Sequence, residues 1–149
     1  MMKISTKGRY ATRIMVFLAL NSADRPARKH EIAESEGIPA DYVEQILSKL
    51  KTTGLVKSRR GARGGFQLGR DPRDITVADV LASTEGPLSL APCVEESCDR
   101  VTKCVARPIW LEASNKLWSV FSNKTIACLA QQAKQMTDDG DDQSLSYEI

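Results

Sequence analysis

Apolar residues near the start of the chain recur at the spacing of an amphipathic helix. They occupy positions i, i+3, i+4, i+7 and i+8, which share one helix face: Ala11, Ile14, Met15, Leu18 and Ala19. The unbroken apolar run from Ile14 to Leu20 is at the lower limit of a secretory signal peptide, and Arg13 adjoins it. The pattern therefore predicts a helix of the mature protein, and with it a cytoplasmic location.

The next segment predicts a short helix, a sharp turn and a second helix. His30–Glu36 forms the short helix, and Gly37 ends it because glycine adopts the left-handed backbone that such a turn requires. Pro39 suits the first turn of the following helix, which Gly54 ends. The buried face of this second helix is predicted to carry Val43, Ile46, Leu47 and Leu50.

Two short strands, Leu55–Ser58 and Phe66–Leu68, flank a loop that contains three arginines and three glycines. The later part of the chain predicts three more helices, Thr76–Ser83 with Thr76 as its cap, Pro108–Phe121 and Ile126–Met136. Residues 85–107 are expected to be irregular. Thr137–Ile149 is acidic and poor in apolar residues, so it is expected to be disordered.

Charge is distributed unevenly along the chain. The net charge is only +2, but residues 1–75 hold 15 Lys/Arg against 8 Asp/Glu, a net +7, whereas residues 76–149 hold 6 against 11, a net −5. This asymmetry indicates a polyanionic partner for the first half.

The single histidine, His30, and the absence of Gly-x-Ser-x-Gly and Walker sequences argue against an enzyme. No apolar run approaches the roughly 20 residues of a membrane span.

Together these elements predict a mainly α fold with a small β wing, a winged helix-turn-helix that binds double-stranded DNA. The exposed face of the second helix can enter the major groove, where Glu44 can accept from cytosine and Gln45 can pair with adenine. Arginines of the wing suit phosphates or a narrow minor groove. The predicted DNA contacts in these two elements are Asp41, Tyr42, Glu44, Gln45, Ser48, Lys49, Arg59, Arg60, Gly61 and Arg63.

Three cysteines, Cys93, Cys98 and Cys104, lie in a polar segment with the spacing C-x4-C-x5-C. Their thiolates can converge on one soft metal centre, such as an iron–sulfur cluster. A structural zinc ion, which takes four ligands, a redox-active thiol pair and inert buried thiols remain open alternatives. Cys128 lies in an apolar helix and is better explained by core packing.

Several segments resemble one family of regulators, the IscR/NsrR/CymR-type (Rrf) winged-helix proteins. The resemblance covers roughly residues 2–130 and includes the three loop cysteines. The segments that carry it are Ile4–Ala11, Asp41–Leu50, Gly54–Val56, Arg60-Gly61, Gly64–Phe66 and Arg107–Trp110.

The resemblance implies a homodimeric repressor that binds a palindromic operator under the control of an iron–sulfur cluster, with [4Fe–4S] favoured over [2Fe–2S]. The chain would then comprise a DNA-binding domain (1–84), a cluster-binding loop (85–107), dimerisation helices (108–136) and an acidic tail (137–149). Cys93, Cys98 and Cys104 would hold the cluster. Phosphate contacts are expected at Lys3, Ser5, Thr6 and Lys7, and the dimer interface is expected at Ile109, Ala113, Leu117, Trp118 and Phe121.

The sequence departs from the family pattern around the cluster. The first cysteine spacing is x4 where x5 is usual, Arg107 replaces the histidine of IscR-like members, and Arg9 replaces the aspartate of NsrR-like members. The fourth ligand is therefore unassigned among Glu95, Glu96, Ser97, Asp99, a residue of the partner chain and a small thiol. Two other signals stay open: nitric oxide in an NsrR-like repressor, and a protein partner or thiol redox in a cluster-free CymR-like regulator.

Overall fold

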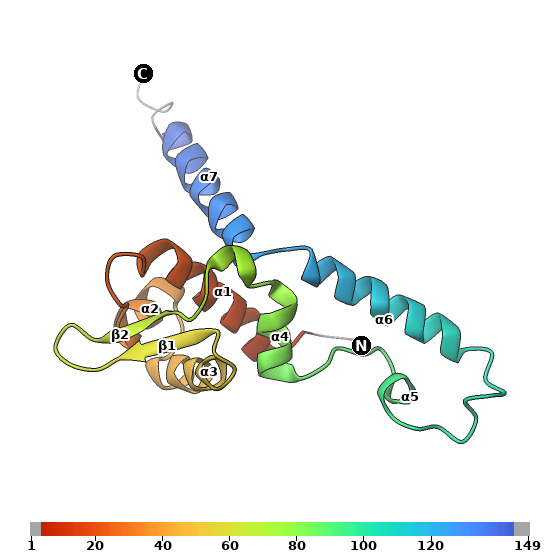
Figure 1. Ribbon diagram of the computed structural model, residues 1–149. Helices are drawn as coiled ribbons and strands as arrows, with labels where there is room; N and C mark the ends of the chain where they lie inside the picture. The colour runs from red at the N-terminus through yellow and green to blue at the C-terminus, as the bar shows by residue number, and fades with distance from the viewer. Residues whose placement is uncertain (1–3, 145–149) are drawn as a thin grey trace.

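The structure, a computed structural model, describes residues 4–144. It is mainly helical with one two-stranded antiparallel sheet, which is the predicted fold class. Figure 1 shows a helical body with the sheet at one end, and α6 and α7 extending away from that body in different directions. The elements follow in the order α1 (Thr6–Asn21), α2 (Lys29–Glu36), α3 (Ala40–Thr52), β1 (Val56–Arg59), β2 (Gly65–Leu68), the 3-10 turn η1 (Pro72–Asp74), α4 (Val77–Glu85), α5 (Pro92–Glu95), α6 (Arg107–Ser122) and α7 (Ile126–Ser144).

Helix α1 supplies much of the core, because it packs against α2, α3, α4, β2 and α7. The predicted apolar face is confirmed: Ala11, Ile14, Met15 and Leu18 are buried, and Ala19 is half-buried. The Ser5 hydroxyl caps the helix by accepting from the Gly8 N–H at 3.1 Å. Full burial of each large apolar side chain contributes about 1.5–3 kcal/mol, so this face anchors the N-terminal body.

Helix α3 buries the predicted face against the same core. Val43, Ile46, Leu47 and Leu50 are fully buried, whereas the residues between them are exposed or half-buried. The helix therefore presents one continuous polar face to solvent.

The wing is a hairpin in which Val56 pairs with Leu68 and Arg59 pairs with Gly65. Its strands begin and end within one residue of the predicted positions. A third segment joins this sheet, because Ala27 and Phe66 exchange backbone hydrogen bonds of 2.9 and 2.8 Å. The sheet is thereby attached to the residues that precede α2.

The corner between α6 and α7 is anchored to the start of α4. The Val77 N–H donates to the Lys124 carbonyl, and the Ile126 N–H donates to the Ile75 carbonyl, both at 2.8 Å. Ile126 is fully buried, and Thr76 caps α4 as predicted. These contacts attach the base of α6 to the helical body, from which α6 projects (Figure 1).

Two features differ from the expectations for the C-terminal half. The segment 85–107, expected to be irregular, contains the single-turn helix α5. The expectation of disorder over Thr137–Ile149 is wrong for residues 137–144, because α7 continues to Ser144. Extending a formed helix adds one hydrogen bond per residue and needs no new nucleus, and no proline interrupts this stretch. The last five residues of the predicted tail lie outside the described part of the chain.

Candidate DNA interface and cysteine loop

The turn between α2 and α3 has the geometry that the sequence predicts. Gly37 adopts a left-handed conformation (φ 63°, ψ 36°) at the end of α2. The Ile38 N–H donates a hydrogen bond to the Ala33 carbonyl at 3.0 Å. Val43 is fully buried. Helices α2 and α3 pack against each other, and together they form a helix-turn-helix.

The predicted base-reading side chains lie on the exposed face of α3. Asp41, Glu44, Gln45, Ser48 and Lys49 are all exposed. Their positions follow from the burial of the opposite face, so the structure brings them together on one surface. Their contacts with DNA stay a prediction.

Tyr42 is half-buried and has a second role within the protein. Its ring packs edge-on against Tyr10 of α1, with ring centroids 5.9 Å apart. The Arg13 guanidinium lies 5.4 Å from the centroid of the Tyr10 ring, and its Nε lies 2.9 Å from Glu36 Oε2. These contacts fix α1 relative to both helices of the helix-turn-helix.

Glu44 is held by a partner that the sequence did not indicate. Lys29 Nζ, on the first residue of α2, lies 2.6 Å from Glu44 Oε2. This hydrogen bond lowers the pKa of Glu44 below its ordinary value and raises that of Lys29. The carboxylate is therefore ionised and oriented in the DNA-free protein.

The wing carries exposed arginines at its tip. Arg59, Arg60, Gly61 and Arg63 are all exposed. The turn needs glycine at position 64, where a Cβ would lie 2.3 Å from the Arg59 carbonyl oxygen. The four predicted contact residues of the wing thus lie in one compact turn.

The phosphate contacts at the N-terminus stay a prediction, and two of the residues have partners within the chain. The Ser5 hydroxyl, besides capping α1, donates to Glu85 Oε1 at 2.8 Å, and the Thr6 hydroxyl accepts from Arg9 Nη2 at 3.2 Å. Lys7 is half-buried. Ser5 and Thr6 therefore already have partners within the chain, and Lys3 lies outside the described residues.

Basic residues before α2 are functional candidates that the sequence interpretation missed. Arg25 and Arg28 precede α2, Lys29 is its first residue, and none of the three was among the predicted DNA contacts. The structure places this stretch beside the wing, because the Arg28 Nη2 donates to the Ala62 carbonyl at 2.7 Å. The density of positive charge over five residues is the signal that could have identified it.

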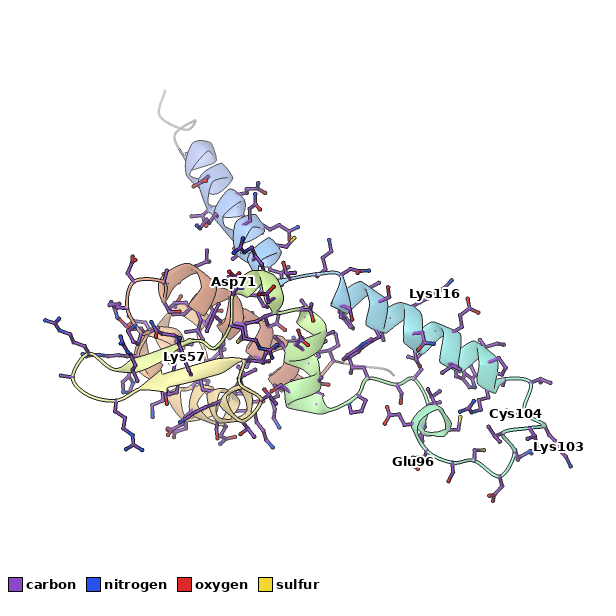
Figure 2. The ribbon with its side chains drawn as sticks, in the orientation of Figure 1. Lys57, Asp71, Glu96, Lys103, Cys104 and Lys116 are labelled. Carbon is purple, nitrogen blue, oxygen red and sulfur yellow. The ribbon has the colours of Figure 1, made fainter. Side chains whose placement is uncertain are left out.

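The cysteine loop lies between α4 and α6, at the end of the molecule opposite the wing (Figure 1). Cys93 belongs to α5, and Cys98 and Cys104 follow it; all three are half-buried free thiols. Figure 2 shows Glu96, Lys103 and Cys104 along this loop. Among the side chains that the structure describes, which end at residue 138, no three of Cys, His, Asp or Glu are close enough to hold a metal ion.

Two hydrogen bonds attach this loop to α6. Arg107 Nε donates to the Cys93 carbonyl at 3.0 Å, and the Leu90 N–H donates to the Oγ of buried Ser114 at 3.1 Å. Arg107 thus contacts the backbone of a candidate ligand residue. Glu95, Glu96, Ser97 and Asp99, the candidate fourth ligands of this chain, are exposed.

Helix α6 has apolar residues on the sides that the rest of the chain leaves uncovered. Ile109 is 60% exposed and Val120 is 59% exposed. Ala113, Leu117, Trp118 and Phe121, also predicted for the dimer interface, are instead half-buried. Trp110, whose apolar bulk on this helix agrees with a dimer, is also exposed, and so are Leu111 and Val120, which the sequence did not indicate.

No helix within residues 4–144 combines the length and apolar character that crossing a bilayer requires.

Comparisons with known proteins identify relatives over nearly the whole chain. A model of the Rrf2 family, described as an iron-dependent transcriptional regulator, matches residues 4–132. Protein rrf2 of Nitratidesulfovibrio vulgaris is 34% identical over 134 residues, which cover 89% of each chain. Among solved structures, CymR, the global cysteine regulator of B. subtilis, has a TM-score of 0.75 and 37% identity, over 89% of this chain and 98% of that one.

A second solved structure, IscR of T. potens, also has a TM-score of 0.75, with 33% identity over 91% of this chain and 90% of that one. These relatives are transcriptional regulators and not enzymes. DNA binding is a property of the family. The chain belongs to the Rrf2 family of transcriptional regulators.

Proposed function

We propose that this protein is a cytoplasmic, homodimeric repressor whose binding to a palindromic operator is controlled by an iron–sulfur cluster on the cysteine loop. The observation that carries the proposal is the attachment of that loop to α6, whose base is attached in turn to the DNA-binding body. A change in the loop can therefore act on the orientation of the helix-turn-helix.

The DNA-reading part of the proposal rests on the exposed face of α3 and on the wing. Glu44 and Gln45 face solvent on α3, and their side chains have the acceptors and donors that read cytosine and adenine in the major groove. Arg59, Arg60 and Arg63 would contact backbone phosphates or the minor groove beside it.

The residues of the loop fit an iron–sulfur cluster in their chemistry. Cys93, Cys98 and Cys104 are free thiols, and thiolates are the usual protein ligands of such clusters, which are redox-active and labile. The described side chains do not converge on one point, so the loop must close to bring them together. We propose [4Fe–4S] occupancy, with a fourth ligand from the loop, the partner chain or a small thiol.

Closing the loop offers a physical route from the cysteines to the DNA. Arg107, the first residue of α6, donates to the Cys93 carbonyl, and Ser114 on the buried side of α6 accepts from the Leu90 N–H. Ordering the loop would restrain α6, and α6 in a dimer sets the spacing of the two recognition helices. The operator affinity of the dimer would change as a consequence.

The proposal of a homodimer rests on the uncovered apolar residues of α6. Exposed apolar side chains grouped on one helix are costly in water and indicate an interaction surface. Ile109, Trp110 and Val120 project from a helix that stands away from the body (Figure 1). A second copy of α6 would cover them and give the two-fold symmetry that a palindromic operator requires.

A second candidate is a cluster-free regulator that responds to thiol redox. The likeness to CymR, the global cysteine regulator of B. subtilis, favours it, and the three loop thiols are free. In this version, oxidation of the loop thiols would control DNA binding.

Anaerobic purification followed by iron and sulfide analysis distinguishes the two candidates. About four iron and four sulfide per chain with broad visible absorption would support the [4Fe–4S] version, and about two of each would indicate [2Fe–2S]. A colourless protein that does not take up a cluster under anaerobic reconstitution would exclude cluster control and favour the thiol version.

A further inference from the structure

A basic cleft lies between the segment that precedes α2 and the tip of the wing. Its volume is about 550 Å³. We call it the arginine cleft, and it is lined by Arg25, Pro26, Arg28, Glu31, Arg63 and Gly64.

Both walls of the arginine cleft are held by hydrogen bonds. Ala27 pairs with Phe66 in β2 through two backbone hydrogen bonds, and the Arg28 side chain donates to the Ala62 carbonyl. At Gly65, a Cβ would lie 2.5 Å from the Ala27 carbonyl oxygen, so only glycine permits this approach. The backbone of both walls is therefore fixed by the fold.

The charges of the cleft do not cancel. Glu31 accepts from Arg25 Nη2 at 2.5 Å and from the Arg28 N–H at 2.7 Å. These hydrogen bonds, with that from the Arg25 side chain the largest, lower the pKa of Glu31 to about 2. Glu31 is paired with Arg25, and the lining, with three arginines and one glutamate, keeps a net positive charge at Arg28 and Arg63.

The geometry points to a binding site for one backbone phosphate of the bound DNA strand, with Arg28 and Arg63 as its donors. A guanidinium group presents paired N–H donors that match phosphate oxygens. The cleft opens between α2, the helix that crosses the backbone in a helix-turn-helix complex, and the wing, which follows the neighbouring groove. The Arg25–Glu31 pair would position the Arg28 backbone without contacting the phosphate.

This inference deepens the proposed function and rests on its placement of α3 in the major groove. A phosphate contact carries no sequence information but adds to the salt dependence of binding. Its loss should weaken binding to every DNA sequence alike. If Arg28 only held the wing in position, its loss would not lower the slope of log K against log salt by the amount expected for one phosphate contact.

The test compares the full-length wild type with Arg28→Gln and, as a charge-matched control, Arg73→Gln. Arg73 belongs to η1 and is paired with Asp71. The probe is a random-sequence DNA duplex, titrated over a range of salt concentrations. Arg28→Gln should bind about tenfold more weakly, with a slope of log K against log salt that is smaller by about 0.9 per bound protomer. Arg73→Gln should match the wild type.

A second measurement keeps the result independent of any change in wing position. Single phosphates of a duplex selected by the wild type are replaced by neutral methylphosphonates. One replacement per half-site should weaken the wild type and leave Arg28→Gln unchanged. Equal sensitivity of both proteins at every position, or an unchanged salt slope, would overturn the inference.

Two further outcomes distinguish failure of the phosphate site from failure of the proposed function. In the first, the wild type binds inorganic phosphate, Arg28→Gln does not, and both bind DNA equally well. This result would assign the cleft to a free anion and overturn the DNA-phosphate site. A wild type that binds neither the random nor any selected duplex would overturn the inference together with the proposed function.

Discussion

Lys29 Nζ lies 2.6 Å from Glu44 Oε2, which pairs the first residue of α2 with a side chain on the exposed face of α3. The Lys29 side chain is 29% exposed and that of Glu44 is 61% exposed, so water and DNA can still reach the carboxylate. The partner of Glu44 lies on the neighbouring helix and not within α3 itself. The pair keeps Glu44 charged and restricts its orientation.

Replacing Lys29 should change the titration of Glu44. Because the shared hydrogen bond lowers the pKa of Glu44 in the folded protein, the pair contributes to stability above the unfolded-state pKa, near 4.5, and this contribution is lost as the pH falls through the lower folded value. Lys29→Gln should raise the Glu44 pKa toward its ordinary value and remove this small dependence. Carboxyl NMR titration checks it; identical Glu44 titration in both proteins would contradict the pairing.

Replacing Glu44 should relax the choice of operator. If Glu44 accepts from a cytosine amino group, Glu44→Ala loses discrimination of about 1–3 kcal/mol at one base pair in each half-site. Selection from random DNA by the wild type, by Glu44→Ala and by Glu34→Ala, an exposed acid of α2, measures this. The same preference in all three proteins would remove Glu44 from base reading.

The turn between α2 and α3 should tolerate asparagine better than alanine. Gly37 has φ of 63°, and a Cβ there would meet no atom within 4 Å, so the cost of substitution is conformational. Gly37→Ala should lower the free energy of unfolding by about 1–2 kcal/mol, and Gly37→Asn by less, because asparagine adopts this backbone more readily. Urea unfolding gives both values, and equal stability of Gly37→Ala and wild type would contradict the assigned backbone.

Neighbouring positions of α3 should separate folding from DNA binding. Leu47 is fully buried, so Leu47→Ala should lower the free energy of unfolding by about 2–5 kcal/mol. Lys49 is exposed, so Lys49→Ala should change stability by less than about 0.5 kcal/mol and still weaken DNA binding. Denaturation and DNA titration on both variants check this; a Lys49→Ala protein with wild-type affinity would exclude Lys49 from the interface.

The exposed residues of α6 should control dimerisation. Ile109→Glu places a charge within the proposed interface, so it should shift the protein from dimer to monomer in sedimentation experiments. Lys116→Gln is the control on the same helix, since the Lys116 side chain is 78% exposed and pairs with Glu112, four residues earlier. A monomeric wild type, or an unaffected Ile109→Glu dimer, would contradict the proposed α6 interface.

Local patterns predicted much of the fold. Helical spacing identified the buried faces of α1 and α3, and glycine chemistry identified the turn at Gly37. Each of these features depends on residues close together in the sequence. The polar face of α3 followed directly from the burial of its opposite side.

Contacts between distant segments could not be predicted in the same way. Nothing in the local pattern pairs Lys29 with Glu44, attaches Ala27 to Phe66 or places Arg28 beside the wing. The apolar pattern of α6 likewise did not show which side the chain itself would cover, so Leu111 and Val120 were missed. The extension of α7 beyond Met136 was missed because the prediction relied on composition alone. A helix that has already formed extends readily even through polar residues.

In the proposed function, the cysteine loop controls DNA binding through an iron–sulfur cluster. The most direct test is the affinity of the anaerobically reconstituted protein for a duplex selected from random DNA, before and after removal of iron by a chelator. Cys98→Ala is the test variant, and Cys128→Ala, which replaces a half-buried thiol on α7, is the control. We expect chelation to change the affinity of the wild type and of Cys128→Ala about tenfold or more, and Cys98→Ala to bind no cluster and to match the iron-free wild type. Equal affinity of all forms, with and without iron, would exclude control of DNA binding by a cluster.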